Sequence, residues 1–343
     1  MTPLIAMPGP WLPDDAADAR ALGAIPELPA LTRLLRRARR LQDAEDWRAG
    51  VLAALGAGSG VSPVSVAAQA VPVLAQDATL CFAAPLHVVA GMSRVHLQPG
   101  GRLLLDSPED QAWCDAFNQE FGSSGLRLHV ASPGGGWLLS APFAHSARDP
   151  APQILVGTAL ERQPAASEEE RSLRRLGAEV EMWLSGHALN RVREARRQPP
   201  INALWFWDGA RADALPAMRV PRGIVDGSGL PDAWLAGLAR HFAVPAAIGR
   251  DWHHAMRAVE ATAGAGPLLI VLAPDSGGAT GQYWQMLEDH WFAPAARALA
   301  EGGITGLRLQ IGPGAFALPN RSLSAWLRWR RRSWWQLCGQ VRP

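Results

Sequence analysis

The chain has 343 residues, of which 48% are hydrophobic and 19% charged, and its formal net charge is +2. These values are typical of a globular protein of one or two domains, and they exclude long disordered stretches. A net charge this small argues against a general nucleic-acid coat protein, because such a protein needs a large basic excess. The sequence contains no Lys, which excludes a lysine Schiff base and a lysine-containing phosphate loop.

Three cysteines lie far apart, at positions 81, 114 and 338. Because no C-x-x-C pair is present, they predict neither a disulfide framework nor a zinc site, and they indicate a reducing compartment. The first residues, MTPLIAMPGPWLPDD, lack a basic segment followed by a long apolar run. No window reaches the roughly 20 apolar residues of a membrane helix. We therefore expect a cytoplasmic protein without a transmembrane segment.

The first 160 residues change in texture near residue 79. The apolar run 4–7 ends at Pro-Gly-Pro and predicts a buried first strand, and leucine spacing predicts helices at 31–41 and 47–55. After residue 79, strands within 80–97 and 101–105, a helix over 107–121 and a hairpin around 133–136 are expected. This second block indicates a mixed α+β segment.

A capping-box pattern at Ser167 and Glu170 predicts the start of a long helix whose apolar face continues to His187. Beyond Pro200 the pattern alternates between strands and helices, and the apolar run LLIVL (268–272) is typical of a central parallel strand. Strands are expected at 201–207, 222–227, 267–274 and 307–311, and helices at about 231–242, 252–263 and 283–300.

We therefore predict an α/β fold with a doubly wound, mostly parallel sheet and a smaller inserted α+β domain. The core comprises residues 1–76 and 201–343. The insertion covers residues 77–200 and ends in the long connecting helix.

Two places in this fold are candidates for ligand contacts. The strand INALWFW runs into Asp208-Gly209, and strands that stop at Asp-Gly usually face a crevice. Asn190, Arg193 and Arg197 share one side of the preceding helix, as a solvated basic face or as an anion-binding face. Asp275 follows the apolar strand at its carboxyl end, and is either a ligand-facing residue or a helix cap.

The nine histidines are scattered without metal-ligand spacing, so no metal site is predicted. The tail WLRWRRRSWW (326–335) interleaves Arg with Trp. Such a segment stacks on single-stranded nucleic acid, lies on a phospholipid surface, or packs its tryptophans on the sheet while its arginines reach solvent. The third interpretation is favoured because no other basic patch accompanies the tail.

Several segments together resemble a known family. They are PLHV, RVHL, LLLDSPEDQAWCDAFNQEFGSSGLRL and LGAEVEMWLSGHALNRVREARRQPPINALWFWDGA, followed by LEDHWFAPAARAL and WLRWRRR. The chain is similar, over nearly its whole length, to a proteobacterial family labelled either cofactor-independent phosphoglycerate mutase or the xanthomonad pathogenicity-regulation protein E type. It departs from the family pattern at Ala84, at Ala188-Leu189 and at residues 208–210.

A looser resemblance connects Asn190, Arg193 and the Pro200–Asn202 segment, with Gly209, to archaeal-type independent mutases of the alkaline-phosphatase superfamily. That superfamily implies two divalent metals that activate a nucleophile and clamp phosphate. The positions where it implies metal ligands here read Met7-Pro8-Gly9, Thr280-Gly281 and Leu309-Gln310-Ile311-Gly312.

The resemblance thus implies a degenerate phosphoglycerate-mutase-like protein without metal ligands, catalytic residues or a cofactor. We expect a regulatory or scaffold protein that binds a small anionic, phosphorylated ligand, with a protein partner as a further expectation. The ligand cleft would be lined by Asn190, Arg193, Asn202, Trp207 and Asp275. Two alternatives stay open: an active mutase or phosphoryl-transfer enzyme with an unrecognised site, and nucleic-acid or membrane-surface binding through the Trp/Arg tail.

Overall fold

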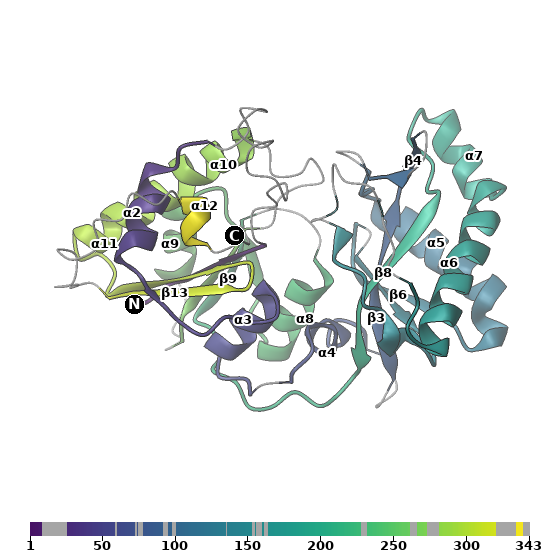
Figure 1. The fold of residues 1–343 in the computed structure, drawn as a ribbon, viewed down its shortest axis with the longest axis horizontal. Coiled ribbons are helices and arrows are strands. Elements are labelled where there is room, and N and C mark those ends of the chain that lie inside the picture. The colour runs from purple at the N-terminus through teal and green to yellow at the C-terminus, as the bar shows by residue number, and fades with distance from the viewer. Residues whose placement is uncertain are drawn as a thin grey trace.

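Two sheets organise the chain, one of seven strands and one of four (Figure 1). The structure is a computed structural model. It describes residues 1–8, 26–58, 60–72, 74, 78–91, 95–97, 101–134, 136–152, 155, 160, 164–227, 232–260, 266–272, 281–319 and 334–338.

The seven-stranded sheet has the order β10-β9-β11-β1-β12-β13-β2. Five neighbouring strands, from β10 to β12, run parallel, and β13 and β2 are antiparallel additions at one edge. The predicted α/β fold with a mostly parallel sheet is therefore confirmed, as is the central position of the LLIVL strand. The strands are β1 (Leu4–Met7), β2 (Arg39–Arg40), β9 (Gly223–Asp226), β10 (Ala246–Ile248), β11 (Leu268–Val271), β12 (Gly306–Ile311) and β13 (Gly314–Pro319).

The four-stranded sheet is antiparallel, with the order β6-β7-β3-β8. It contains the predicted hairpin, which is β6 and β7. It also contains INALWFW, which we expected in the parallel sheet; that strand pairs with β3 along its length instead. The strands are β3 (Thr79–Leu86), β6 (Arg127–Ser132), β7 (Gly136–Ser140) and β8 (Ala203–Arg211), and a separate pair is β4 (Val89–Ala90) with β5 (Val95–His96).

Helices separate and cover the two sheets (Figure 1). One group packs on the outer face of the seven-stranded sheet, a second lies between the sheets, and a third covers the outer face of the four-stranded sheet. The first group is α2 (Pro29–Arg37), α9 (Trp252–Glu260), α10 (Gly281–Leu287) and α11 (Ala293–Ala300), with the short α12 (Trp334–Leu337); the second is α3 (Trp47–Ala54), α4 (Pro63–Ala68) and α8 (Ala233–Phe242); the third is α5 (Ser107–Phe121), α6 (Glu168–Ser185) and α7 (Ala188–Ala195).

Period-two alternation in the strands assigns side chains to these layers. In β1, Leu4 and Ala6 face the core between the sheets, whereas Ile5 and Met7 face the outer helices. In β8, Trp205 and Trp207 face the core between the sheets, and Leu204 and Phe206 face α5 and α6. Because successive side chains of a strand point to opposite faces, each sheet contributes to two hydrophobic cores.

The long helix predicted from Ser167 onward begins as expected but is not continuous. The Ser167 hydroxyl accepts a hydrogen bond from the Glu170 backbone N–H, as a capping residue does. α6 then ends at Gly186, and His187 starts α7 by accepting a hydrogen bond from the Leu189 N–H through Nδ1. The predicted buried face therefore ends one turn early, because glycine terminates helices readily and the His187 side chain caps a new one.

The predicted helix 283–300 is also interrupted, by a π-helical turn at Glu288–Phe292 between α10 and α11. The Glu288 carboxylate, buried at this turn, accepts hydrogen bonds from the N–H groups of Ala30 and Leu31. These N–H groups belong to the first turn of α2, which leaves such donors without partners of its own. These hydrogen bonds thus connect the first turn of α2 to the π-helical turn between α10 and α11.

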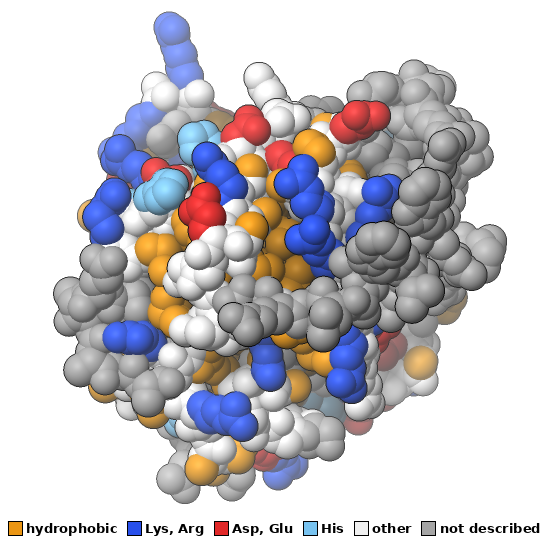
Figure 2. Space-filling view, turned by 90° about the vertical axis from the view of Figure 1, so that its left-hand side faces the viewer, with side chains coloured by type: hydrophobic (Ala, Val, Ile, Leu, Met, Phe, Trp, Pro, Cys, Tyr) orange, Lys and Arg blue, Asp and Glu red, His pale blue; other side chains and the backbone are white. Residues whose placement is uncertain are grey.

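The end of the molecule formed by the outer helices carries basic, acidic and hydrophobic side chains in an interspersed arrangement (Figure 2). In the described part of the chain, no helix combines the length and apolarity needed to cross a bilayer.

Candidate functional site

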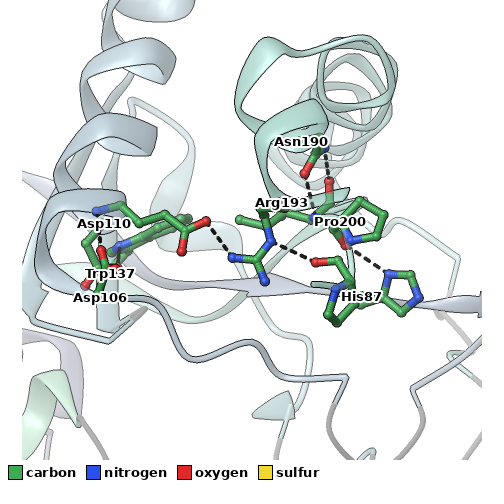
Figure 3. Close-up of polar contacts among 10 residues, drawn as sticks. His87, Asp106, Asp110, Trp137, Asn190, Arg193 and Pro200 are labelled. Atoms are coloured by element: carbon green, nitrogen blue, oxygen red, sulfur yellow. Dashed lines mark hydrogen bonds and ion pairs between the residues drawn. The ribbon is translucent and has the colours of Figure 1, made fainter. Parts of the chain in front are cut away.

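Asn190, a predicted ligand contact, lies at the junction of α6, α7 and β8, where its side chain forms hydrogen bonds with the backbone (Figure 3). Its Nδ2 donates to the carbonyl oxygens of Leu184 (2.8 Å) and Ile201 (2.7 Å), and its Oδ1 accepts from the Ile201 N–H (2.8 Å). The side chain is 5% exposed. Asn190 therefore fixes the turn that leads into β8.

The Arg193 side chain, like that of Asn190, bonds to other groups of the protein. Its Nε donates to the carbonyl oxygen of Pro199 at 2.8 Å, and its Nη1 forms an ion pair with the Glu109 carboxylate of α5 at 2.5 Å (Figure 3). The residue is 4% exposed. Because both interactions lie inside the protein, the guanidinium connects α5 to the end of α7.

Two further predicted contacts also have internal partners. Asn202 pairs with the backbone of Val88, since its Oδ1 accepts from the N–H and its Nδ2 donates to the carbonyl oxygen, both at 2.8 Å. Trp207 is buried and stacks on Phe82 with ring centroids 5.3 Å apart. The structure thus brings Asn190, Arg193 and Asn202 to one end of the four-stranded sheet, where their side chains bond to other groups of the protein. Asp275 lies outside the described residues.

A large cavity lies elsewhere, between the two sheets. Its volume is about 1620 Å³, and residues of both sheets and of α3 line it. Pro8, which follows β1, and Gly312, which follows β12, place one wall at the carboxyl ends of central parallel strands. Ligands of α/β proteins typically bind at this edge. The charged lining residues are Asp43, Glu45, Asp46, Arg48, Arg148, Asp149, Asp208, Arg211, Asp232 and Arg308.

A β-bulge at Asp208-Gly209 forms part of the cavity wall. Trp207 pairs with Phe82 and Ala210 with Leu80, so two residues of β8 lie opposite Cys81 alone. Asp208 has a φ of 48°, in the left-handed region that residues other than Gly adopt at a cost. Regular alternation would direct Asp208 to the face of Leu204 and Phe206, whereas the bulge places it in the cavity lining.

Gly209 is required by the same bulge. Its N–H donates to the Ala147 carbonyl at 2.8 Å, and its own carbonyl accepts from Arg148 Nη1 at 3.1 Å. A Cβ at this position would overlap the carbonyl oxygen of Ala144. Glycine therefore permits the backbone contact that holds Arg148 beside Asp208.

The Asp208 carboxyl is held in an unusual electrostatic environment. Its Oδ2 is buried and has no hydrogen-bond partner among the described residues. Burial, together with the nearby carboxylates of Asp46 and Glu45, raises the pKa of this carboxyl to about 6 against the lowering effect of Arg48 and Arg148. A buried carboxyl with a raised pKa that faces a cavity is a candidate functional group.

Arg48, which belongs to α3, lines the cavity. Its Nη2 forms an ion pair with Asp232 at 2.8 Å, and its guanidinium carbon lies 4.6 Å from the ring centroid of Trp47 and 5.5 Å from that of Phe82. The residue is 4% exposed, and its Nε has no hydrogen-bond partner. Opposite charge from Asp232 and Asp46 raises the pKa of Arg48 despite its burial, so the cation is permanent.

Three further arginines of the wall are more accessible to solvent than Arg48. Arg148 and Arg211 are exposed and Arg308 is half-buried, so their charges are available to a molecule in the cavity. His145 also lines the cavity, and its Nδ1 is buried without a hydrogen-bond partner. The site therefore offers arginines from both sheets and several carboxyl groups, among which the Asp208 carboxyl has an oxygen without a partner in the described part of the chain.

Sequence reasoning found part of this site. It selected Asp208-Gly209 as a strand end facing a crevice; the strand continues to Arg211, but the pair does face a cavity. It missed Arg48 and Arg148, because these residues meet Asp208 through contacts distant in sequence. The available signal for Arg48 was its place beside Trp47 in an otherwise apolar helix, where a cation needs a partner.

Within the described residues, no three His, Cys, Asp or Glu side chains are grouped in a way that could hold a metal ion. The Gln310 side chain, at the end of β12 where the superfamily resemblance implies a metal ligand, is buried and donates to the Gly312 carbonyl at 2.7 Å. The absence of a metal centre stays a prediction, because residues 273–280 lie outside the described ranges.

No protein-family model matches the chain, and no curated protein matches it. Among solved structures, it is similar to the cofactor-independent phosphoglycerate mutase from Thermoplasma acidophilum DSM 1728, with 15% identity, 99% coverage of both chains and a TM-score of 0.38. It is also similar to the PH0037 protein from Pyrococcus horikoshii, with 11% identity, coverage of 92% of this chain and 86% of the other, and a TM-score of 0.40. The similarity is distant.

Proposed function

We propose that this chain is a non-catalytic ligand-binding protein, and that the cavity between its two sheets binds a small molecule with an anionic group. The observation that carries this proposal is the cavity of about 1620 Å³ into which both sheets contribute arginines. Arg148 and Arg211 approach it from the four-stranded sheet, and Arg308 from the seven-stranded sheet. Guanidinium groups bind carboxylates and phosphates through paired N–H donors.

The ligand cleft in this proposal differs from the predicted one in its residues. Asn190, Arg193 and Asn202 stabilise the four-stranded sheet and its connections, as their internal hydrogen bonds indicate. Arg148, Arg211 and Arg308 take over the anion-binding role. Asp275 remains in the proposal because it follows β11 in the sequence, and β11 lies directly beside β1 in the sheet.

A non-catalytic role is supported by the residues at the carboxyl ends of the central strands. Hydrolysis or transfer of phosphate in the superfamily that the sequence resembles needs two metal ions held by carboxylates and imidazoles. Met7 is buried in the helix-facing core, and Gln310 bonds to its own strand end. We propose on this basis a regulatory or scaffold protein related to the phosphoglycerate-mutase-like family named from the sequence.

Calorimetric titration with 3-phosphoglycerate tests the binding proposal. We expect saturable binding that weakens by roughly tenfold in Arg148→Ala, because a charge-assisted hydrogen bond is lost. The control is Arg196→Ala, which removes an exposed arginine at the end of α7, outside the cavity lining. Absence of binding, or equal loss in both variants, would contradict the proposal.

The rival function is an active phosphoglycerate mutase or other phosphoryl-transfer enzyme. Mutase and phosphatase assays with added manganese separate the two. We expect no turnover above that of heat-denatured protein. Manganese-dependent turnover that Asp275→Ala abolishes would establish the enzyme instead.

The second alternative, binding through the Trp/Arg tail, rests on residues that mostly lie outside the described ranges. Trp334, which is described, is buried against Trp284 with ring centroids 4.8 Å apart, and its Nε1 donates to the Pro26 carbonyl. This packing favours the interpretation in which tail tryptophans join the core. Salt-sensitive binding to vesicles or single-stranded DNA, lost on deletion of residues after 325, would support the alternative.

A further inference from the structure

Anion binding does not explain the carboxyl groups in the cavity wall, of which Asp208 stands out by its environment. An anionic ligand would be repelled by it, and no described residue donates a hydrogen bond to its buried Oδ2. Of the nearby cations, Arg48 pairs with Asp232, and Arg148 uses its Nη1 for the Gly209 carbonyl. Leaving a buried carboxylate oxygen unsatisfied costs stability.

The backbone at Asp208 also adopts an unfavourable conformation. Asp208 is strained at a φ of 48°, and its bulge turns the side chain away from the apolar core of α5 and α6. Strained residues and bulges concentrate where a side chain must be aimed at a ligand. The bulge therefore places the Asp208 carboxyl in the cavity wall, beside any molecule that occupies the cavity.

We infer that Asp208 binds an ammonium group of the ligand, so that the cavity accepts a small zwitterion carrying both an amine and an anionic group. This inference rests on the proposed function for the anionic half. The two halves fit one small molecule, because Arg148 hydrogen-bonds the carbonyl of the residue that follows Asp208. The carboxyl and the guanidinium are thus neighbours on one wall.

An ammonium group fits this position better than a neutral hydroxyl. Asp46 and Glu45 act on Asp208 with like charge, as their effect on its ionisation shows. A positive charge from the ligand would relieve this repulsion, whereas a hydroxyl would supply only a hydrogen bond. Arg48 is held by its ion pair with Asp232 and by its contacts with the rings of Trp47 and Phe82.

Three probes of similar size test the inference: taurine, which has an ammonium and a sulfonate, ethanesulfonate, which has only the anion, and ethylammonium, which has only the cation. Sulfonates keep their charge across the accessible pH range, so any difference reports the ammonium group. At pH 7.5 we expect taurine to bind at least tenfold more tightly than ethanesulfonate, in line with one charge-assisted interaction.

Variants assign that preference to the carboxyl. In Asp208→Asn, taurine and ethanesulfonate should bind with affinities equal within about twofold, while Asp208→Glu should retain part of the preference. Asn tolerates the left-handed backbone, so the fold is preserved. The control is Asp213→Asn, an exposed carboxyl outside the cavity lining, which should keep the full preference.

Equal affinities of wild-type protein for taurine and ethanesulfonate would overturn the inference, as would a preference that survives Asp208→Asn. Failure of all three probes to bind would also overturn it. The proposed function is judged separately by the 3-phosphoglycerate titration, so anion binding that depends on Arg148 can stand without an ammonium site at Asp208.

Discussion

At the scale of single residues, the side chains that the sequence singled out divide into structural and cavity-facing groups. Asn190 and Arg193 have chemistry suited to anions, but in the structure their polar atoms bind backbone carbonyls and Glu109. Asp208 and Arg148 face the cavity. Residue type alone could not separate these groups, because a buried arginine needs a partner whether that partner is a ligand or the protein.

Arg193→Ala should therefore affect stability and spare ligand binding. Removing one partner of a buried ion pair leaves the Glu109 charge without compensation, which typically costs about 3 kcal/mol. Urea denaturation followed by circular dichroism measures the loss. Arg196→Ala, at an exposed position, should change the free energy of unfolding by less than about 0.5 kcal/mol. A stable Arg193→Ala protein with impaired ligand binding would restore Arg193 to the site.

Asp208 makes a pH-dependent contribution to stability. Its pKa is raised in the folded protein to about 6, so the folded state binds the proton more tightly than the unfolded state does. Stability from this group consequently increases as the pH falls from about 6 to about 4, and the ionised carboxylate is destabilising at pH 7.

Asp208→Asn should remove that effect. We expect the variant to be more stable than wild type by about 2 kcal/mol at pH 7, with the difference vanishing below about pH 4. The groups that act on this carboxyl are Glu45 and Asp46 before α3, Arg48 in α3 and Arg148 after β7. Denaturation curves at several pH values measure the difference, and a gain that is constant with pH would contradict the assignment.

At the scale of elements, local patterns predicted where helices and strands occur better than where they break. The apolar runs of β1 and β11 and the Ser167 cap of α6 are encoded by neighbouring residues, and the structure confirms them. The interruptions at Gly186 and Glu288 were missed. They depend on packing, since Glu288 is drawn to the free N–H groups of α2 and the segment around His187 contacts Trp113.

The bulge in β8 depends on the close approach of Gly209 to the segment that follows β7. Gly209→Ala should destabilise the protein by about 3 kcal/mol, because the new methyl group would overlap the Ala144 carbonyl and displace the Arg148 loop. Gly122→Ala is the matched control, since no atom lies within 4 Å of a Cβ there and the backbone is right-handed helical. Thermal unfolding compares the two, and equal melting temperatures would disprove the proposed contact.

At the scale of the whole molecule, alternation of strands and helices predicted the parallel sheet correctly but assigned INALWFW to it. That strand pairs with β3, more than a hundred residues earlier in the chain, and no local pattern encodes such a distant partner. The cavity arises from the same long-range arrangement, because α3 and β12 provide one wall and β8 and the segment after β7 the other. Of this cavity the sequence indicated only the strand end at Asp208-Gly209, whereas the residues named as cleft contacts lie outside its lining or outside the described ranges.

The most direct test of the central claim is a crystal structure of the protein soaked with 3-phosphoglycerate and manganese, with anomalous scattering recorded at the manganese edge. We predict ligand density between the two sheets, with its anionic group at the Arg148 guanidinium, and no anomalous peak at the carboxyl ends of β1 and β12. Manganese bound there by protein side chains, with phosphate as a further ligand, would contradict the account and identify a metal-dependent enzyme.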